Sequence, residues 1–322
     1  MRAWLCLSVL LALGACDASP KPLPPAASGA PLAWRTLSPS PSSRTEVAAT
    51  VLDKKIYVAG GYQADGATVG TVEVYDTTAD RWTTGPELPV PVNHAMAATV
   101  SGTVYVFGGY DKFNQSFAGA FRLTDGGWQS IPDLPEPRAA ATAAVVGERV
   151  YLAGGIGAGG SLAASMLVYD TVTRQWSTAP GMPTPREHLG GAGFDGRVYT
   201  VGGRTAAAGN LGALEIFDTR TQKWSSGPAM PTPRGGMSAA ALCTGALIAA
   251  GGEAQATFPE VELFDLASGS WQALPPLPTP RHGLGVVTVG TQLYVQSGGK
   301  QPGLHVDNTT EALDLGALGS CR

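Results

Sequence analysis

Short runs of alternating apolar and polar residues, separated by turn residues, repeat along most of the chain. Residues 188–227 show the pattern as HLGGAGF, a turn at Asp195-Gly196, RVYTVGG, a variable polar loop, LEIFD, a second turn and KWSSG. Period-two alternation between Gly, Asp and Asn residues indicates antiparallel strands and hairpins. Outside the first 15 residues no segment carries a sustained 3.6-residue apolar period. The pattern predicts an all-β chain built from four-stranded units.

Two further marks show that this unit is copied. Tryptophans recur at intervals of 48, 46, 48, 48 and 47 residues, at Trp34, Trp82, Trp128, Trp176, Trp224 and Trp271. Glycine pairs keep step with them, at 60–61, 108–109, 154–155, 202–203, 251–252 and 298–299. A period of this length indicates one supersecondary unit that buries its apolar face only against its neighbours. We therefore expect six equivalent units.

The size of the side chains along each unit predicts how the units are arranged. The first run of each copy is rich in Gly and Ala, as in HAMAATV (94–100), AAATAAVV (139–146) and GGMSAAAL (235–242). Small residues suit strands that crowd around one axis, and the Tyr, Phe and Trp residues of the later runs belong farther out. Such a taper, in repeats of 40–50 residues, indicates the blades of a β-propeller.

The repeat resembles the kelch repeat, in which a hydrophobic run ends in Gly-Gly and an aromatic–Asp pair precedes a Trp by six residues. The pairs here are Tyr75-Asp76, Tyr169-Asp170, Phe217-Asp218 and Phe264-Asp265, with Leu313-Asp314 as a weakened last copy. The second copy departs from the pattern, with Phe121-Arg122 in place of the pair. The resemblance covers residues 33–315 and implies a six-bladed kelch β-propeller.

The order of the marks predicts how the ring closes. The first Trp precedes the first glycine pair, and no Trp follows the last pair. We therefore expect an N-terminal segment around Trp34 to supply the outer strand of the last blade. This closure would remove an exposed sheet edge.

The N-terminal residues read as a targeting segment. Residues 1–15 combine a short charged start with an apolar run too short to span a bilayer, as in a signal peptide. LGAC (13–16) resembles the bacterial lipobox, which implies that Cys16 is acylated; the alternative is cleavage without lipid. Residues 16–32 are rich in proline and predict a tether. We expect a lipid-anchored protein of the bacterial cell envelope, with residues 316–322 as a C-terminal tail.

Charge excludes one class of partner. The formal net charge is −4 and no basic run occurs, so neither nucleic acid nor an anionic lipid surface is expected as a partner. We expect a monomer that binds an unknown protein or glycan and contacts the bilayer through acylated Cys16. GGIGAGG (154–160) contains a G-x-G-x-x-G pattern, but a strand and not a helix follows it, so we reject a dinucleotide site.

Two cysteines lie outside the targeting segment. Cys243 ends the first strand of the fifth unit and Cys321 follows the third strand of the sixth, so both should emerge on one face of neighbouring blades. A disulfide between them would pin the tail in an oxidising envelope. The alternative is a free, buried Cys243.

Candidate ligand contacts fall on the opposite face, which we call the upper face, where the loops after each glycine pair and the Pro-x-Pro-Arg turns lie. The residues that follow the glycine pairs differ in chemistry, which suits recognition: Tyr62, Tyr110, Ile156, Arg204, Glu253 and Lys300. An Arg stands ten residues after most tryptophans, at Arg44, Arg138, Arg186, Arg234 and Arg281, with Val92 in the second copy. We interpret these arginines as structural, bonded to loop carbonyls, and keep the last four among the candidate ligand contacts.

Three histidines should also lie near the upper mouth of the channel. His94 and His188 stand two residues past the Arg position and His282 stands one past it. Three His can bind zinc, but we expect residues on different blades to lie too far apart to converge. We therefore predict hydrogen-bonded loop histidines and no metal, cofactor or catalytic residue.

The leading functional hypothesis is a non-catalytic, membrane-tethered binding module with its ligand on the upper face. No nucleophile–base signature or lid-sized loop is present. The kelch resemblance also implies enzymes of two types. A galactose oxidase would need a cysteine on the upper face, whereas a sialic-acid mutarotase needs an acid/base pair near a sugar, for which Glu46, His94, His188 and Arg204 are candidates. A scaffold in an envelope complex is the third hypothesis. A closed-bottom pocket would favour the enzyme.

Overall fold

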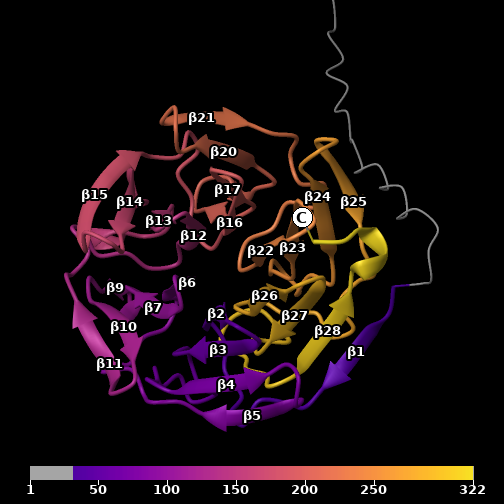
Figure 1. Cartoon of the computed structure of the whole chain (residues 1–322), viewed down its shortest axis with the longest axis horizontal. Helices are drawn as coiled ribbons and strands as arrows, with labels where there is room; N and C mark the ends of the chain where they lie inside the picture. The colour runs from indigo at the N-terminus through magenta and orange to yellow at the C-terminus, as the bar shows by residue number, and fades with distance from the viewer. Residues whose placement is uncertain (1–31, 322) are drawn as a thin grey trace, which may run out of the picture.

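The computed structural model describes residues 32–321, which fold into six four-stranded antiparallel sheets around one axis. Figure 1 shows the sheets arranged radially, each next to its neighbours in chain order. The predicted all-β, six-bladed propeller is confirmed. In each blade the first strand lies at the centre and the fourth at the rim.

The first three blades follow the chain from the centre outward. Blade 1 contains β2 (Ala48–Leu52), β3 (Lys55–Ala59), β4 (Val72–Asp76) and β5 (Arg81–Thr84). Blade 2 contains β6 (Met96–Val100), β7 (Thr103–Phe107), β10 (Ala120–Thr124) and β11 (Gly127–Ile131). Blade 3 contains β12 (Thr142–Val146), β13 (Arg149–Ala153), β14 (Ser165–Asp170) and β15 (Gln175–Pro180).

The next two blades repeat this order and the last combines both ends of the described chain. Blade 4 contains β16 (Gly190–Phe194), β17 (Arg197–Val201), β20 (Leu214–Asp218) and β21 (Lys223–Ser226). Blade 5 contains β22 (Ser238–Leu242), β23 (Ala246–Ala250), β24 (Val261–Asp265) and β25 (Ser270–Ala273). Blade 6 contains β26 (Gly285–Val289), β27 (Gln292–Gln296), β28 (Thr310–Asp314) and β1 (Trp34–Leu37).

Short elements lie between the main strands. Two small hairpins extend the loops between the second and third strands of blades 2 and 4: β8 (Tyr110–Lys112) with β9 (Gln115–Ser116), and β18 (Arg204–Thr205) with β19 (Gly209–Asn210). Two 3-10 turns are η1 (Ala158–Gly160) and η2 (Gly316–Leu318). None of the helices in the described residues combines the length and apolar character needed to cross a bilayer.

The apolar core lies between the blades. Six clusters of buried side chains each join residues of two neighbouring blades, so each unit buries its faces only against the next. The inner strands carry small residues because a larger side chain would clash there. A Cβ added to Gly193, for example, would lie 1.9 Å from the Val145 carbonyl oxygen of the preceding blade.

The seam of the ring is made by strand β1, which pairs antiparallel with β28, Trp34 opposite Leu313 and Leu37 opposite Thr310. The two strands lie side by side in Figure 1, indigo against yellow. The Trp34 indole donates a hydrogen bond to the Pro275 carbonyl, 2.9 Å away, at the end of blade 5. The predicted closure by an N-terminal outer strand is confirmed.

The other tryptophans make the same bond between neighbouring blades. Each indole nitrogen donates to a backbone carbonyl in the segment that leaves the preceding blade, at 2.8 Å: Ser38, Pro86, Pro132, Pro180 and Pro228. The regular spacing of the tryptophans thus reflects a belt of inter-blade hydrogen bonds around the rim, and Trp34 extends this belt across the seam.

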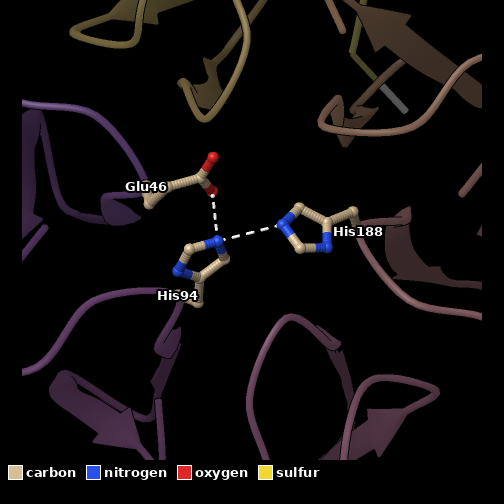
Figure 2. Close-up of side chains that lie close together, drawn as sticks. All are labelled: Glu46, His94 and His188. Atoms are coloured by element: carbon tan, nitrogen blue, oxygen red, sulfur yellow. Dashed lines mark hydrogen bonds and ion pairs between the residues drawn. The ribbon is translucent and has the colours of Figure 1, made fainter. Parts of the chain in front are cut away.

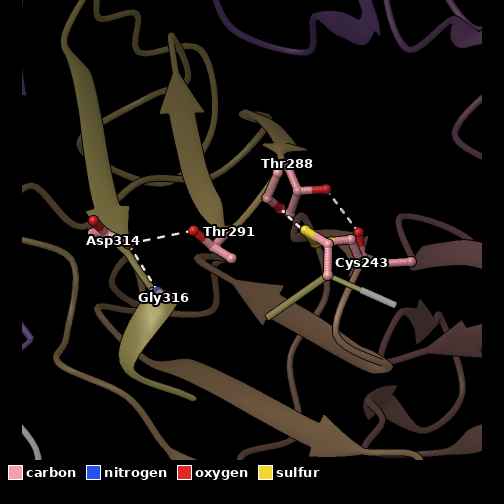
Figure 3. Close-up of a disulfide and its surroundings, with 8 residues drawn as sticks. Cys243, Thr288, Thr291, Asp314 and Gly316 are labelled. Atoms are coloured by element: carbon pink, nitrogen blue, oxygen red, sulfur yellow. Dashed lines mark hydrogen bonds between the residues drawn. A yellow bond between two sulfur atoms is a disulfide. The ribbon is translucent and has the colours of Figure 1, made fainter. Parts of the chain in front are cut away.

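The C-terminal tail is attached to blade 5. Cys321 forms a disulfide with Cys243, in the turn between β22 and β23. Figure 3 shows this bridge beside the end of blade 6, where the Gly316 amide donates to the Asp314 carboxylate. The two cysteines emerge on the same face of neighbouring blades, opposite the upper face.

We expect removal of residues 32–37 to lower the unfolding midpoint of the whole propeller. The deletion takes away a complete ladder with β28 and leaves an unpaired edge that promotes aggregation. Thermal unfolding followed by circular dichroism measures the effect. Arg35→Ala, an exposed change that keeps the backbone pairing, is the control and should unfold near the parent midpoint. An unchanged cooperative midpoint in the deletion variant would contradict the role of the seam.

Candidate ligand-binding site at the mouth of the channel

A ring of backbone hydrogen bonds surrounds the mouth of the channel on the upper face. The residue two past the Arg position adopts a left-handed backbone in every blade: Glu46, His94, Ala140, His188, Gly236 and Gly283, with φ between 51° and 67°. Each amide from His94 onward donates to the carbonyl of its counterpart in the preceding blade at 2.9–3.0 Å, and the Val47 amide closes the ring on Gly283 at 3.3 Å. The ring therefore sets these six residues around one axis.

Three of the ring's side chains converge on the axis. His94 Nε2 lies 2.9 Å from His188 Nε2 and 3.2 Å from Glu46 Oε2, as Figure 2 shows. The expectation that histidines on different blades lie too far apart is therefore wrong for this pair. The ring has a short radius, so side chains from different blades can meet at its centre. The other three positions carry only Ala or Gly, which leaves space for them. A Cβ on Gly283 would lie 2.7 Å from the Glu46 carboxyl carbon, so its absence makes room for that carboxylate.

Neighbouring residues orient both imidazoles through their Nδ1 atoms. His94 Nδ1 lies 2.6 Å from the Asn93 amide oxygen, which can only accept, so Nδ1 carries the hydrogen of the neutral ring. His188 Nδ1 contacts the carboxylate of Glu187, which when ionised can also only accept. Both histidines therefore direct the other nitrogen, Nε2, to the centre of the ring.

A second set of charged residues adjoins this cluster. His282 Nδ1 lies 3.2 Å from Glu46 Oε1 and 3.5 Å from Glu253 Oε2. Arg204 bridges Glu187 at 3.1 Å and Glu253 at 2.8 Å, and its side chain keeps 30% of its surface exposed. The mouth is therefore a connected network in which Arg204 presents the partly exposed cation.

Burial and charge shift the pKa values within this network. Burial lowers the pKa of His94. Burial and the nearby charge of His94 together lower the pKa of His188 well below its ordinary value. Burial alone would raise the pKa of Glu46, but the charges of His94 and a hydrogen bond from His282 outweigh it and hold that pKa low. Burial would likewise lower the pKa of His282, but Glu46 and Glu253 raise it. At neutral pH the site thus combines neutral His94 and His188 with an ionised Glu46.

Two cavities meet at the cluster. A cavity of about 390 Å³ opens on the upper face, and a smaller one of about 130 Å³ lies among the inner strands. Glu46, His94 and His188 line both, so they stand between the mouth and the channel. Tyr62, Arg204, Glu253 and His282 complete the polar part of the mouth.

The rim of the mouth is apolar. Phe113, at the tip of the β8–β9 hairpin, is 88% exposed, and Leu304, in the blade 6 loop, is 47% exposed. Both side chains line the mouth cavity, together with Gly66 of blade 1. Loops of blades 6, 1 and 2 thus set two apolar side chains above a charged floor.

The residues predicted after the glycine pairs are brought together only in part. Tyr62, Arg204 and Glu253 line the mouth cavity. Tyr110 is buried and its ring centroid packs 5.3 Å from that of His94. The sixth position is occupied by Gly299, which pairs with His282 as Tyr62 pairs with Thr45.

The prediction that Lys300 is the sixth residue of this set is therefore wrong. In blade 6, Ser297 and Gly298 take the places that the two glycines of the pair occupy in the other blades. Ser297 adopts the left-handed backbone, and the Gly298 amide donates the inter-blade hydrogen bond to the Arg44 carbonyl. Lys300 consequently stands one residue past the ring and pairs with Asp307. The distance from the repeated arginine indicates this register, since Ser297 follows Arg281 by 16 residues, as Gly60 follows Arg44.

The arginines kept as candidate ligand contacts are placed elsewhere. Arg138, Arg186, Arg234 and Arg281 are fully buried and lie outside the mouth cavity. Arg186, for example, donates to the carbonyls of Gly202 and Thr200 and pairs with Glu215 at 2.6 Å. These bonds to the blade's own loop account for the repeat of Arg, so the four side chains are not positioned to contact a ligand in this cavity.

Buried Arg–Glu pairs occur in four blades: Arg44–Glu73, Arg186–Glu215, Arg234–Glu262 and Arg281–Glu311. The other two blades lack the glutamate of this pair. Blade 2 has Val92 and Phe121 at the two positions, and blade 3 has Arg138 with Leu167. A buried carboxylate is thus found only where an arginine neutralises it.

Several residues of the site were not among the sequence candidates. Asn93 and Glu187 each contact the histidine that follows them in the chain. Phe113 and Leu304 border the cavity from loops of different blades, which no motif spacing encodes. Glu46 is among the sequence candidates for ligand contact and for acid/base chemistry, and it follows Arg44 by two positions, as His188 follows Arg186. That shared position would have placed it in the same ring. Cys16 and the targeting segment lie outside the described residues.

A six-bladed propeller with a polar cavity at the channel mouth defines the class of this protein, and comparison identifies the repeat. The chain matches the KLHDC2/KLHL20/DRC7 Kelch-repeats domain over residues 46–182 and 133–299. It therefore belongs to the kelch-repeat family, whose members are generally protein-binding modules.

Individual relatives match over shorter segments. Beta-scruin of Limulus polyphemus is 33% identical over 76 residues, which cover 24% of this chain and 8% of that protein. Kelch-like protein 40 of Xenopus laevis is 32% identical over 77 residues, 24% of this chain and 12% of that protein. Kelch-like protein 23 of Homo sapiens is 40% identical over 72 residues, 22% and 13% respectively. The chain thus spans less than a sixth of each of these relatives.

We expect Arg186→Met to destabilise the protein by about 3–5 kcal/mol, because it leaves Glu215 buried without its counter-charge. Urea unfolding measures the loss. The double variant Arg186→Met/Glu215→Leu copies the leucine of blade 3 and should recover a large part of the stability. A double variant as unstable as the sum of the two single variants would show that the pair is not coupled.

Proposed function

We propose that this protein is a non-catalytic binding module that recognises a protein partner through the mouth of its upper face. The partner would insert a polar or charged side chain into the cavity and cover Phe113 and Leu304. Membership of the kelch-repeat family supports a protein ligand. The chemistry of the cavity, with Arg204 paired to Glu187 and Glu253, would select the inserted group.

One observation carries this proposal. Three large apolar side chains are exposed in the described chain, Phe113, Val172 and Leu304, and two of them border the same cavity. They come from blades 2 and 6, so they are neighbours only because the ring closes. An apolar rim around a small polar pocket is the arrangement of a protein interface with a central anchor.

We further propose that the module is tethered to a membrane outside the cytoplasm of a bacterial cell. The support is the sequence alone: the apolar run of residues 1–15, the lipobox-like LGAC (13–16) and the proline-rich segment 16–32. In this arrangement acylated Cys16 anchors the chain, and the linker lets the propeller extend from the bilayer surface.

A crosslinking residue placed at the rim should capture the partner. We expect a photo-crosslinking amino acid at position 113 or 304 to capture a discrete partner in cells, because both side chains lie at the proposed interface. Val172, which is 71% exposed in the β14–β15 turn, is the matched control and should capture no such species. Equal capture from all three positions, or none from the rim, would overturn the proposed interface.

The tether is tested separately. We expect Cys16→Ser to move the protein from the membrane fraction to the aqueous fraction, because the lipid attachment atom is lost. Fractionation followed by mass spectrometry of the N-terminal peptide measures both location and modification. Cys243→Ser, which opens the bridge to Cys321 but leaves Cys16 in place, should leave the membrane association unchanged. Membrane retention of Cys16→Ser without any lipid adduct would contradict the anchor.

A carbohydrate-active enzyme of mutarotase type is the second candidate, and one observation favours it. Glu46 and His94 lie 3.2 Å apart in a cavity that Arg204 also lines, so an acid and a base face the same bound sugar. Nuclear magnetic resonance of sialic acid anomers with added protein distinguishes the two functions. Acceleration of anomer exchange that Glu46→Gln abolishes would replace the binding module by the enzyme.

A further inference from the structure

We propose that Glu46, His94 and His188 bind a divalent transition-metal ion of the zinc type at the centre of the channel mouth. The two Nε2 atoms and one carboxylate oxygen all lie within 4.8 Å of one another and come from three different blades. Nothing in the proposed partner interaction requires this ion, so the inference stands apart from it.

The first argument is that three electron-pair donors face one another. The hydrogens of His94 and His188 are directed by Asn93 and Glu187 to the Nδ1 atoms. The Nε2 lone pairs therefore meet at 2.9 Å, with the Glu46 carboxylate 3.2 Å from His94. Such an arrangement repels itself unless a cation lies between the donors. Support of each metal-bound imidazole by an amide or carboxylate at the other nitrogen is typical of metal sites.

The second argument is distance. In a tetrahedral site with zinc–ligand bonds of about 2.0–2.1 Å, neighbouring ligand atoms lie about 3.3 Å apart. The Glu46–His94 separation already has this value, and the His94–His188 separation needs to widen by a few tenths of an ångström. Two histidines and a glutamate with a remaining open position are a ligand set that zinc uses.

The third argument is the backbone that holds the ligands. All three residues have φ between 51° and 55°, a region that costs about 1–2 kcal/mol for a residue with a side chain. Glycine occupies the equivalent positions 236 and 283 without that cost. Blades 1, 2 and 4 thus carry long metal-ligating side chains where glycine would be the less strained choice.

Charge and access agree with a dication. Glu46, Glu187 and Glu253 place three carboxylates around the mouth, against Arg204 and His282. The three ligand residues line the mouth cavity, so the remaining coordination positions of the ion face that cavity. The ion would then present a Lewis-acidic centre to a carboxylate, phosphate or carbonyl group of whatever enters.

The test is titration of the chelator-treated full chain, prepared without a polyhistidine tag, with Co²⁺ followed by Zn²⁺. We expect one Co²⁺ per chain, with the strong visible absorption of a four-coordinate ion, and displacement by one Zn²⁺. This measurement needs no variant. The weak absorption of aqueous six-coordinate Co²⁺ throughout the titration would overturn the proposal.

Substitutions then locate the ion. We expect His94→Gln and His188→Gln each to weaken zinc binding by more than the roughly 10–100-fold that loss of a supporting residue causes. His305→Gln, at the remaining and exposed histidine of the chain, should bind zinc as the parent does. Binding that survives both ligand substitutions, or that His305→Gln abolishes, places the ion elsewhere and refutes this site.

The supporting hydrogen bond gives an independent check. Asn93→Leu removes the acceptor for His94 Nδ1–H, and we expect it to lower zinc affinity about 10–100-fold. Asn93→Asp keeps an acceptor at that place and should retain tight binding. Equal affinities of the two variants would show that Asn93 does not set the tautomer on which the site depends. Crosslinking at position 113 tests the partner interface separately.

Discussion

The ring of backbone hydrogen bonds at the upper mouth is the constraint on which the site depends. It joins equivalent residues of neighbouring blades from Glu46 round to Gly283 and requires a left-handed backbone at each of them. Because these residues are hydrogen-bonded to one another, the positions of their Cα atoms are fixed. A side chain at any of these positions points into the channel. A blade with a long polar residue there adds a functional group, and a blade with Gly or Ala leaves space.

The same geometry separates scaffold from site within each unit. The arginine two residues earlier turns into its own blade and satisfies loop carbonyls and, in four blades, a buried glutamate. The residue after the glycine pair lies over the mouth, where Tyr62, Arg204 and Glu253 differ in chemistry. Buried repeated positions thus hold the blade together, and the positions of the same loops that line the cavity are free to diverge.

The rim and the floor of the mouth have different chemistry and suit different tasks. Phe113 and Leu304 offer apolar surface that another protein can cover, whereas the floor joins imidazoles, carboxylates and a guanidinium in one network. A protein partner and a bound metal ion are therefore compatible proposals. An inserted acidic side chain, for example, would meet both Arg204 and an ion held by Glu46, His94 and His188.

The repeat in the sequence determined the fold, because strand alternation, turn residues and side-chain size are local properties that each copy carries. The order of the six copies also determined how the ring closes. The last copy lacks its outer strand at the C-terminal end, and the segment around Trp34 supplies that strand from the N-terminal end. Only the tertiary structure decided which residues meet. Convergence of Glu46, His94 and His188 depends on the ring radius, and the shift from Lys300 to Gly299 depends on the backbone of Ser297. Such relations across blades are set when the ring closes, and no spacing within a single copy contains them.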